Sequence, residues 1–333
     1  MRWVDIRELS VEGQGWSDTK APFDRLPARA EGVVREVVWN LSRHSAGICV
    51  KFRTDATEIR GRWTLTLDQL AMSHMPATAC SGLDLYIDSE DGLQWAGVGR
   101  PETTPDVAAV LASGLISGEK ECTVYLPLYN GVSSVEIGIP DGASIGAIER
   151  PEGRKTVVFY GTSITHGASA SRCGTNHVAR VGRKLGCEVI NLGFSGNGQM
   201  EPEVASLLAE QDPDVFVIDC LPNMTADLIA ERAGHLVKTI RATRTDPPIL
   251  LVEDRTYGDA RFVPSRKERN ETSRVAFRDV YDSLIAEGVS GLTYMEGASL
   301  LGDDDTVDGS HPTDLGFKRQ ADRFVDQLSA ILG

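Results

Sequence analysis

Ser163 is the residue of this chain whose surroundings best suit a nucleophile. It follows the apolar run 157–160 closely, in the stretch VVFYGTSITHGAS. A serine hydroxyl is a weak nucleophile until a neighbouring base removes its proton. Among the six histidines, His311 in DGSHPTDLG follows Asp308 by three residues, so one turn supplies a base and a carboxylate that fixes the imidazole tautomer. These residue types predict a Ser-His-Asp triad.

Acyl chemistry at Ser163 also needs hydrogen-bond donors for a negatively charged oxygen, and the backbone N–H of Ser163 is one candidate. Gly196 in FSGNG can bring its N–H close to a ligand because it has no side chain, and Asn223 in LPNM carries an amide donor. Each residue also has an ordinary explanation, since serine and glycine often occupy turns, and asparagine and histidine often cap helices. Their joint presence after successive predicted strands favours an oxyanion hole.

The second half of the chain alternates strands and helices, which would bring these residues to one edge of a sheet. Apolar, β-branched runs predict strands at 156–160, 187–192, 214–219, 248–253 and 291–295. Helical spacing occurs at 204–208 and again at 317–331, where Thr313 or Asp314 would cap the helix. This alternation is typical of a parallel sheet covered on both faces, with its chemistry at the carboxyl edge. We place this α/β domain at 151–333.

The first 150 residues follow a different pattern. Apolar and polar residues alternate in short stretches separated by turns, as in ICVKFR, EIRGRWTLT, LDLYI, CTVYLPL and SVEIGI. A period of two residues predicts antiparallel strands, most simply a β-sandwich, with one helix near 104–116. The polar segment 149–155 is the natural boundary. We therefore expect an accessory sandwich domain at 1–150, whose exposed Trp or Tyr side chains would suit carbohydrate binding.

The composition limits the partners of the chain. With 34 basic and 48 acidic residues, the net charge of −14 repels phosphate backbones and anionic lipid, so we expect no nucleic-acid and no membrane partner. The first residues form no apolar leader, and no segment reaches the ~20 apolar residues that span a bilayer. The six cysteines lack Cys-x-x-Cys spacing, which argues against a zinc site. We expect a reduced, cytoplasmic protein; an exported form with a trimmed leader and a homo-oligomer both stay open.

The motifs together resemble the four blocks of the SGNH, or GDSL, hydrolases. Ser163 in GTS, Gly196 in SGNG, Asn223 in LPNM and Asp308 with His311 in DGSH stand in that family's order, over roughly residues 155–333. The stretch GLDLY upstream resembles a β-sandwich that precedes a subset of these enzymes, many of which deacetylate carbohydrates. The resemblance implies a flavodoxin-like three-layer α/β/α catalytic domain, a Ser-His-Asp mechanism, no metal and no cofactor.

The chain departs from known patterns around the nucleophile and in the third block. Thr165 stands where the Gly-x-Ser-x-Gly elbow of the α/β-hydrolases requires glycine, which excludes that elbow. Within the SGNH blocks, Thr162, Leu221 and Met224 replace the usual Asp, Gly and Asp. The third block is therefore bulkier and more apolar than usual, and we expect this difference to affect substrate choice.

The predicted substrate pocket consists of residues beside these blocks: Thr162, His166, Leu221, Met224, Glu253 and Arg255. Two alternatives stay open. His166 would equally suit a solvent-facing place on its loop, and Glu253 and Arg255 would equally suit an ion pair with no catalytic role.

The expected function is hydrolysis of short-chain esters, acetyl first, on a carbohydrate or small polyol. The expected partner is accordingly a small-molecule or oligosaccharide ester. One alternative keeps the triad but passes the acyl group to an alcohol other than water, as an acyltransferase does. A second alternative, from another class, is a carbohydrate-binding protein whose hydrolase half is inactive.

Overall fold

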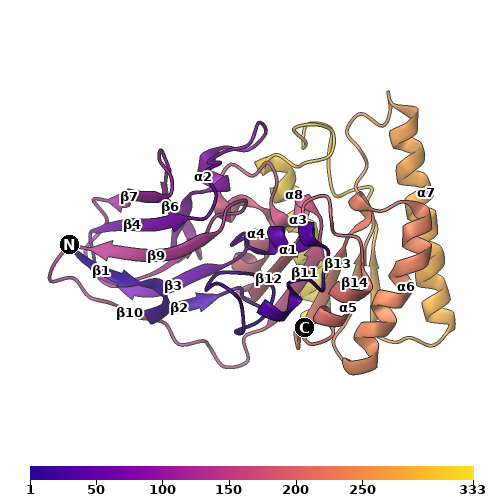
Figure 1. Ribbon diagram of the computed structural model, residues 1–333, viewed down its shortest axis with the longest axis horizontal. Coiled ribbons are helices and arrows are strands. Elements are labelled where there is room, and N and C mark those ends of the chain that lie inside the picture. The colour runs from indigo at the N-terminus through magenta and orange to yellow at the C-terminus, as the bar shows by residue number, and fades with distance from the viewer.

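The alternating stretches of the first half form two antiparallel sheets whose inner faces share one core (Figure 1). The computed structural model describes residues 1–333. The four-stranded sheet has the order β1 (Arg2–Asp5), β9 (Val132–Ile139), β4 (Glu58–Leu65) and β7 (Asp106–Ser113). The six-stranded sheet has the order β10 (Ile145–Ala147), β3 (Cys49–Thr54), β8 (Lys120–Tyr125), β5 (Leu83–Ile87) and β6 (Gln94–Gly99), with β2 (Ser10–Glu12) beside β3. The expectation of antiparallel sheets is confirmed.

The two-residue period of the sequence determines which side chains fill the sandwich. On β4, Ile59 and Trp63 point inward and are almost fully buried, and on β3 Val50 and Phe52 meet them from the other sheet. Each such side chain contributes about 1.5–3 kcal/mol when it is buried. The indole N–H of Trp63 donates to the carbonyl of Ser81 at 2.9 Å, so its one polar group is satisfied.

The helix expected near 104–116 is absent, and β7 occupies this region instead. Val107 and Leu111 are buried in the sandwich core, whereas Ala108 and Val110 between them are exposed. The alanine-rich run DVAAVLAS resembles a helix in composition, but its burial has a period of two. Pairing with the long neighbour β4 therefore overrides its local helical propensity.

The second half forms the α/β domain that the sequence predicts. Its five strands are all parallel, in the order β12 (Glu188–Gly193), β11 (Thr156–Gly161), β13 (Val215–Asp219), β14 (Ile249–Val252) and β15 (Leu292–Met295). Its helices are α3 (Ser163–His166), α4 (His177–Leu185), α5 (Pro202–Leu208), α6 (Ala226–Thr243), α7 (Pro264–Ala286) and α8 (Asp314–Leu332). This strand order is that of a flavodoxin-like sheet.

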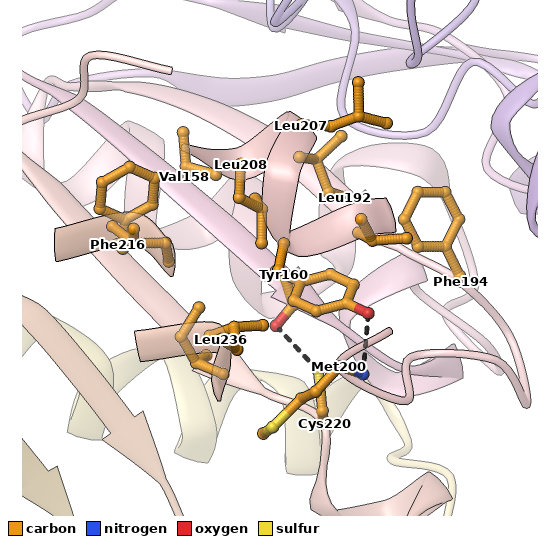
Figure 2. Close-up of a cluster of buried hydrophobic side chains, with 14 of the residues drawn as sticks. Val158, Tyr160, Leu192, Phe194, Met200, Leu207, Leu208, Phe216, Cys220 and Leu236 are labelled. Carbon is orange, nitrogen blue, oxygen red and sulfur yellow. Dashed lines mark hydrogen bonds between the residues drawn. The ribbon is translucent and has the colours of Figure 1, made fainter. Parts of the chain in front are cut away.

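Helices cover both faces of this sheet, which makes three layers. Val158 and Tyr160 of β11 pack with α5, α6 and α7 on one face, and Figure 2 shows them among Leu207, Leu208 and Leu236. Val157 and Phe159 pack with α4 and α8 on the other face. A strand buried on both sides needs a continuous apolar run, which explains the sequence TVVFY. The expected three-layer α/β/α architecture is confirmed.

The two halves share hydrophobic cores. Met75 and Tyr129 from the first half pack with Ile164 of α3 and Phe317 of α8 in one mixed cluster. Two short helices of the first half, α1 (Glu36–Ser42) and α2 (Ala77–Cys80), lie near this junction in Figure 1. The segment from Trp16 to Trp39 also packs against the sheet of the second half, on the α5 side. The first half thus contributes side chains to the core of the second.

All six cysteines are buried and unpaired, and they are spread over the separate cores. None of the helices combines the length and the apolar character that crossing a bilayer requires.

Candidate active site

Three neighbouring strands end at one edge of the sheet and deliver the first three sequence blocks there. Gly161 at the end of β11 pairs with Gly193 of β12 on one side and with Asp219 of β13 on the other. A Cβ atom at Gly161 would lie 2.1 Å from Thr165 Oγ1, and one at Gly193 would lie 2.2 Å from the backbone nitrogen of His166. Glycine at both positions lets α3, which begins with Ser163, pack directly against the strand ends.

Ser163, His311 and Asp308 are joined by two hydrogen bonds. The distance from Ser163 Oγ to His311 Nε2 is 2.9 Å, and that from His311 Nδ1 to Asp308 Oδ2 is 2.7 Å. An ionised carboxylate only accepts, so Nδ1 carries the ring proton and Nε2 accepts from the serine hydroxyl. Ser163 is 6% exposed, whereas the His311 side chain is 25% exposed. The candidate nucleophile is therefore shielded, while its candidate base is accessible from solvent.

Asp308 is held in its ionised form by the turn that carries it. Burial alone would raise the pKa of the Asp308 carboxyl, but hydrogen bonds from the backbone and ring of His311 and from the backbone of Ser310 lower the pKa to about 2. Its Oδ1 accepts from the N–H groups of Ser310 at 3.0 Å and His311 at 2.8 Å. Its Oδ2 stays free for the imidazole, so one carboxylate both shapes the turn and orients the base.

The loop before His311 is anchored through Asp305. This side chain is 1% exposed, pairs with the Arg319 guanidinium of α8, and accepts from the N–H of Gly302 at 2.6 Å. The Asp305 carbonyl accepts from the N–H of Thr313, the cap of α8, at 2.7 Å. The segment that contains His311 is thus tied to α8 at both ends.

Hydrogen-bond donors without partners lie on all three strand-end blocks. Ser163 is the first residue of α3, where a backbone N–H has no partner within the helix. The N–H of Gly196, at φ +70°, and the side-chain amide of Asn223 donate to no group of the protein. The oxygen of that amide accepts from the N–H of Gly198 at 3.2 Å, which fixes the orientation of the amide and leaves its NH₂ group free to donate. Asn223 is therefore not the helix cap; Thr225 caps α6.

Two residues of the first half support these blocks, and sequence reasoning missed both. The Tyr129 hydroxyl donates to the Ser163 carbonyl at 3.4 Å. Arg35 donates from Nη1 to Asn197 Oδ1 at 2.8 Å, beside Gly196 in the second block. Their partners are 34 and 162 residues away along the chain, so no local motif signals these contacts.

Four residues of the predicted pocket are fully buried and expose no surface to a substrate, which corrects the sequence prediction: Thr162, His166, Leu221 and Met224.

The local contacts of these four residues explain their burial. Thr162 caps α3 by accepting from the N–H of Ile164. His166 turns inward, hydrogen-bonds the Leu128 carbonyl at 2.6 Å and stacks on Tyr129 with ring centroids 4.1 Å apart, so its solvent-facing alternative is also wrong. Burial lowers the pKa of His166 well below its ordinary value. Leu221 and Met224 belong to the core under α6 and α7.

Glu253 and Arg255, the other two pocket candidates, are also buried, and each has its own partner. Arg255 is 3% exposed and forms a two-pronged ion pair with Asp219 at the end of β13. Glu253 accepts from the Tyr294 hydroxyl at 2.7 Å and from the N–H of Gly297 at 2.9 Å. They do not pair with each other, and neither forms a hydrogen bond or an ion pair with Ser163, His311 or Asp308. Asp219 also accepts a hydrogen bond from the Thr165 hydroxyl, so this ion pair helps to hold α3 against the end of β13.

No group of three or more His, Cys, Asp or Glu side chains is arranged to hold a metal ion.

Comparisons with known proteins match both halves of the chain. A family model described as the GDSL-like lipase/acylhydrolase family matches residues 154–329, and one described as the N-terminus of an SGNH-hydrolase-type esterase matches residues 1–145. A crystal structure from Bacteroides ovatus, described as a GDSL-like lipase, is 35% identical, with 99% of this chain and 98% of that one covered and a TM-score of 0.95.

More distant solved structures share the fold. A salicylyl-acyltransferase from a tetracycline biosynthetic pathway is 18% identical, with 99% and 97% of the two chains covered and a TM-score of 0.79. A family two carbohydrate esterase from Clostridium thermocellum, solved with cellohexaose, is 14% identical, with 86% and 93% covered and a TM-score of 0.62. The search of curated proteins finds no match to this chain.

Proposed function

The chain belongs to the GDSL-like lipase/acylhydrolase family, and from that premise we propose that it is a serine esterase that removes short acyl groups, acetyl first, from a carbohydrate or small polyol. One observation carries the proposal: the unbroken hydrogen-bonded series from Ser163 Oγ through His311 to Asp308, with links of 2.9 and 2.7 Å. This series is the arrangement that activates a serine hydroxyl.

In the first stage of the proposed reaction, Ser163 Oγ attacks the ester carbonyl carbon as His311 Nε2 takes the hydroxyl proton. Asp308 stabilises the imidazolium that forms and itself stays ionised. The carbonyl oxygen becomes an oxyanion, and the N–H groups of Ser163 and Gly196 with the amide of Asn223 donate to it. Donors that are fixed before the reaction stabilise this charge without reorganisation.

In the second stage the tetrahedral intermediate collapses. His311 gives its Nε2 proton to the leaving alcohol oxygen, the carbon–oxygen bond to the alcohol breaks, and the acyl group stays on Ser163. A water molecule then attacks the acyl-enzyme as Nε2 takes its proton. The acid leaves, and Ser163 recovers its hydrogen.

The acetyl and carbohydrate parts of the proposal are supported by a structural neighbour and by an exposed aromatic side chain. The carbohydrate esterase of C. thermocellum shares the fold. Trp95 on β6 is 51% exposed and offers an indole of the kind on which sugar rings stack. Screening acetylated oligosaccharides against aryl esters of increasing chain length would identify the preferred acyl and alcohol groups.

Replacing the nucleophile tests the central claim. We expect Ser163→Ala to lower turnover of a small aryl acetate by about three or more orders of magnitude, because no other group would form the acyl-enzyme. The midpoint temperature of unfolding should stay close to that of the parent protein. Ser206→Ala, at an exposed position on α5, is the matched control and should keep full activity. Turnover retained in Ser163→Ala would refute the proposal.

Acyl transfer is the second candidate, because a salicylyl-acyltransferase shares the fold over nearly the whole chain. Both reactions form the same acyl-enzyme and differ only in what attacks it. Product analysis with excess alcohol acceptor separates them: free acid throughout rejects transfer, and a new ester supports it. Covalent labelling of Ser163 by a fluorophosphonate would dispose of the inactive, purely carbohydrate-binding alternative.

A further inference from the structure

A segment of the first half brings a second histidine to the catalytic one. The chain between β4 and α2 carries His74, and the ring centroids of His74 and His311 lie 5.5 Å apart, with their planes inclined at 39°. Both β4 and α2 belong to the first half, whereas His311 precedes α8 at the end of the second. The first half therefore contributes a side chain beside the proposed base.

The tip that carries His74 is a tight, anchored turn. Met72 and Met75 hydrogen-bond each other through both backbone pairs, at 2.9 and 3.1 Å, and Ser73 and His74 occupy the two positions between them. Met75 is 2% exposed and packs in the mixed core that also contains Ile164 of the nucleophile helix. The turn that carries His74 is thus anchored in the same hydrophobic cluster that supports the helix of Ser163.

The start of this segment, just after β4, is held by Asn130, which is fully buried. The Asn130 side-chain oxygen accepts from the N–H of Leu67 at 3.0 Å, and its amide donates to the Leu67 carbonyl at 3.0 Å and to Ser81 Oγ at 3.1 Å. Because both ends of the segment are tied down, little ordering entropy remains to be lost when a substrate contacts His74.

No hydrogen bond within the protein involves a ring nitrogen of His74, and the side chain is partly exposed. A neutral imidazole presents one donor and one acceptor. A hydroxyl group also donates once and accepts, so an alcohol-rich ligand matches the free groups of this ring.

We propose that His74 and His311 form the walls of a subsite for the alcohol portion of the ester, in which His74 hydrogen-bonds a hydroxyl of that alcohol. The inference rests on the proposed function. His311 must place its Nε2 proton on the leaving oxygen, so the alcohol has to lie against the His311 ring. A second imidazole at 5.5 Å then faces the atoms next to that oxygen. The ligand class is a polyhydroxylated alcohol, such as a sugar.

This placement distinguishes acylation from the later hydrolysis of the acyl-enzyme. The alcohol is present during acylation and absent once the acyl-enzyme has formed, so His74 affects only acylation. Its contribution should depend on whether the alcohol carries a further hydroxyl. Loss of one such hydrogen bond to a substrate is worth about 0.5–1.5 kcal/mol, or roughly a two- to tenfold change in kcat/KM.

The test compares two esters with the same acetyl group: a mono-acetylated methyl glycoside and 4-nitrophenyl acetate. We expect His74→Ala to lower the ratio of kcat/KM, glycoside over aryl ester, by about two- to tenfold. His74→Phe keeps an aromatic ring and should show the same loss, whereas His74→Gln keeps a donor and an acceptor and should restore much of the ratio. His235→Ala, at an exposed position on α6, is the matched control and should leave the ratio unchanged.

Two results would overturn the inference. An unchanged ratio in His74→Ala means that the ring does not contact the alcohol. An equal loss on both esters means that His74 acts through His311 and not on the substrate. Ser163→Ala, assayed in parallel, keeps the two proposals apart. Inactivity of Ser163→Ala with an unchanged ratio in His74→Ala rejects the subsite alone, and retained turnover in Ser163→Ala rejects the esterase mechanism itself.

Discussion

At the residue scale, the pairing of Asp308 with His311 in the proposed triad follows from a short motif in the sequence. An aspartate three residues before a histidine can bind the turn backbone with one carboxylate oxygen and the ring with the other, and Asp308 does both. The pattern DGSH therefore specifies its own geometry. The link to Ser163 is different, since it joins residues 148 apart and depends on the whole sheet.

The pKa of Asp308 makes its contribution to stability depend on pH. The folded-state pKa of about 2 lies below the ordinary value of 3.8. The ionised carboxylate therefore stabilises the fold fully above about pH 4, and this contribution is lost as the pH falls through 2. We expect the difference in free energy of unfolding between the parent and Asp308→Asn to be largest at pH 6 and smaller at pH 3. Urea denaturation at both values measures it, and a difference that does not change with pH would contradict the assignment.

The pocket residues show where residue-level reasoning ends. Being next to a motif places Thr162, His166 and Met224 near the site, but side-chain direction is decided by what packs around them. The first turn of α3 points His166 toward Leu128 of the other half, and the third block points Met224 into the core. Neither direction can be read from spacing, because each depends on a surface that is distant in sequence.

At the element scale, the parallel strands were predictable because each is a short apolar run followed by a helix. The strand ends then had to meet at one edge, which is why we expected Ser163, Gly196 and Asn223 there, and the three strands that precede them are neighbours in the sheet. The expected helix at 104–116 was wrong, because the alanine-rich composition favours a helix locally while β7 forms there instead. The pairing of β7 with β4 decided between helix and strand.

The close packing of α3 against the end of β11 should make the fold sensitive to a larger residue at Gly161. We expect Gly161→Ala to destabilise the fold by about 1–3 kcal/mol and to impair turnover, because the new Cβ would lie 2.1 Å from Thr165 Oγ1 and 2.8 Å from the Asp219 carbonyl. Urea unfolding with a parallel activity assay measures both effects. Gly146→Ala on β10 is the control, since its Cβ would meet nothing within 4 Å. Equal stability of the two variants would show that α3 is not confined in this way.

At the scale of the whole molecule, the two halves behave as one packed object. Arg25 of the first half is 1% exposed and donates to the carbonyls of Asn191 and Gly193 in β12 as well as to those of Leu41 and His44. With the mixed core around Met75 and Tyr129, this network crosses the boundary that composition suggests near residue 150. The sequence shows where the pattern changes, but it does not show what packs across that change.

This shared packing predicts a single unfolding event. We expect calorimetry to record one transition whose calorimetric and van't Hoff enthalpies agree, because neither half can open without exposing the mixed core. Arg25→Met should lower the temperature of that transition without splitting it, since four backbone carbonyls would lose their donor. Two resolved transitions would mean that the halves are thermodynamically independent.

The distribution of the cysteines gives the molecule a set of internal chemical reporters. Burial raises the pKa of the thiols of Cys49 and Cys122 to about 12 and those of Cys80 and Cys187 to about 11. Thiolates react with alkylating reagents and thiols hardly do, so in the native state these groups are protected twice, by access and by protonation. Each core contains at least one of the six thiols. Their relative alkylation rates would therefore map, core by core, which part of the protein opens first.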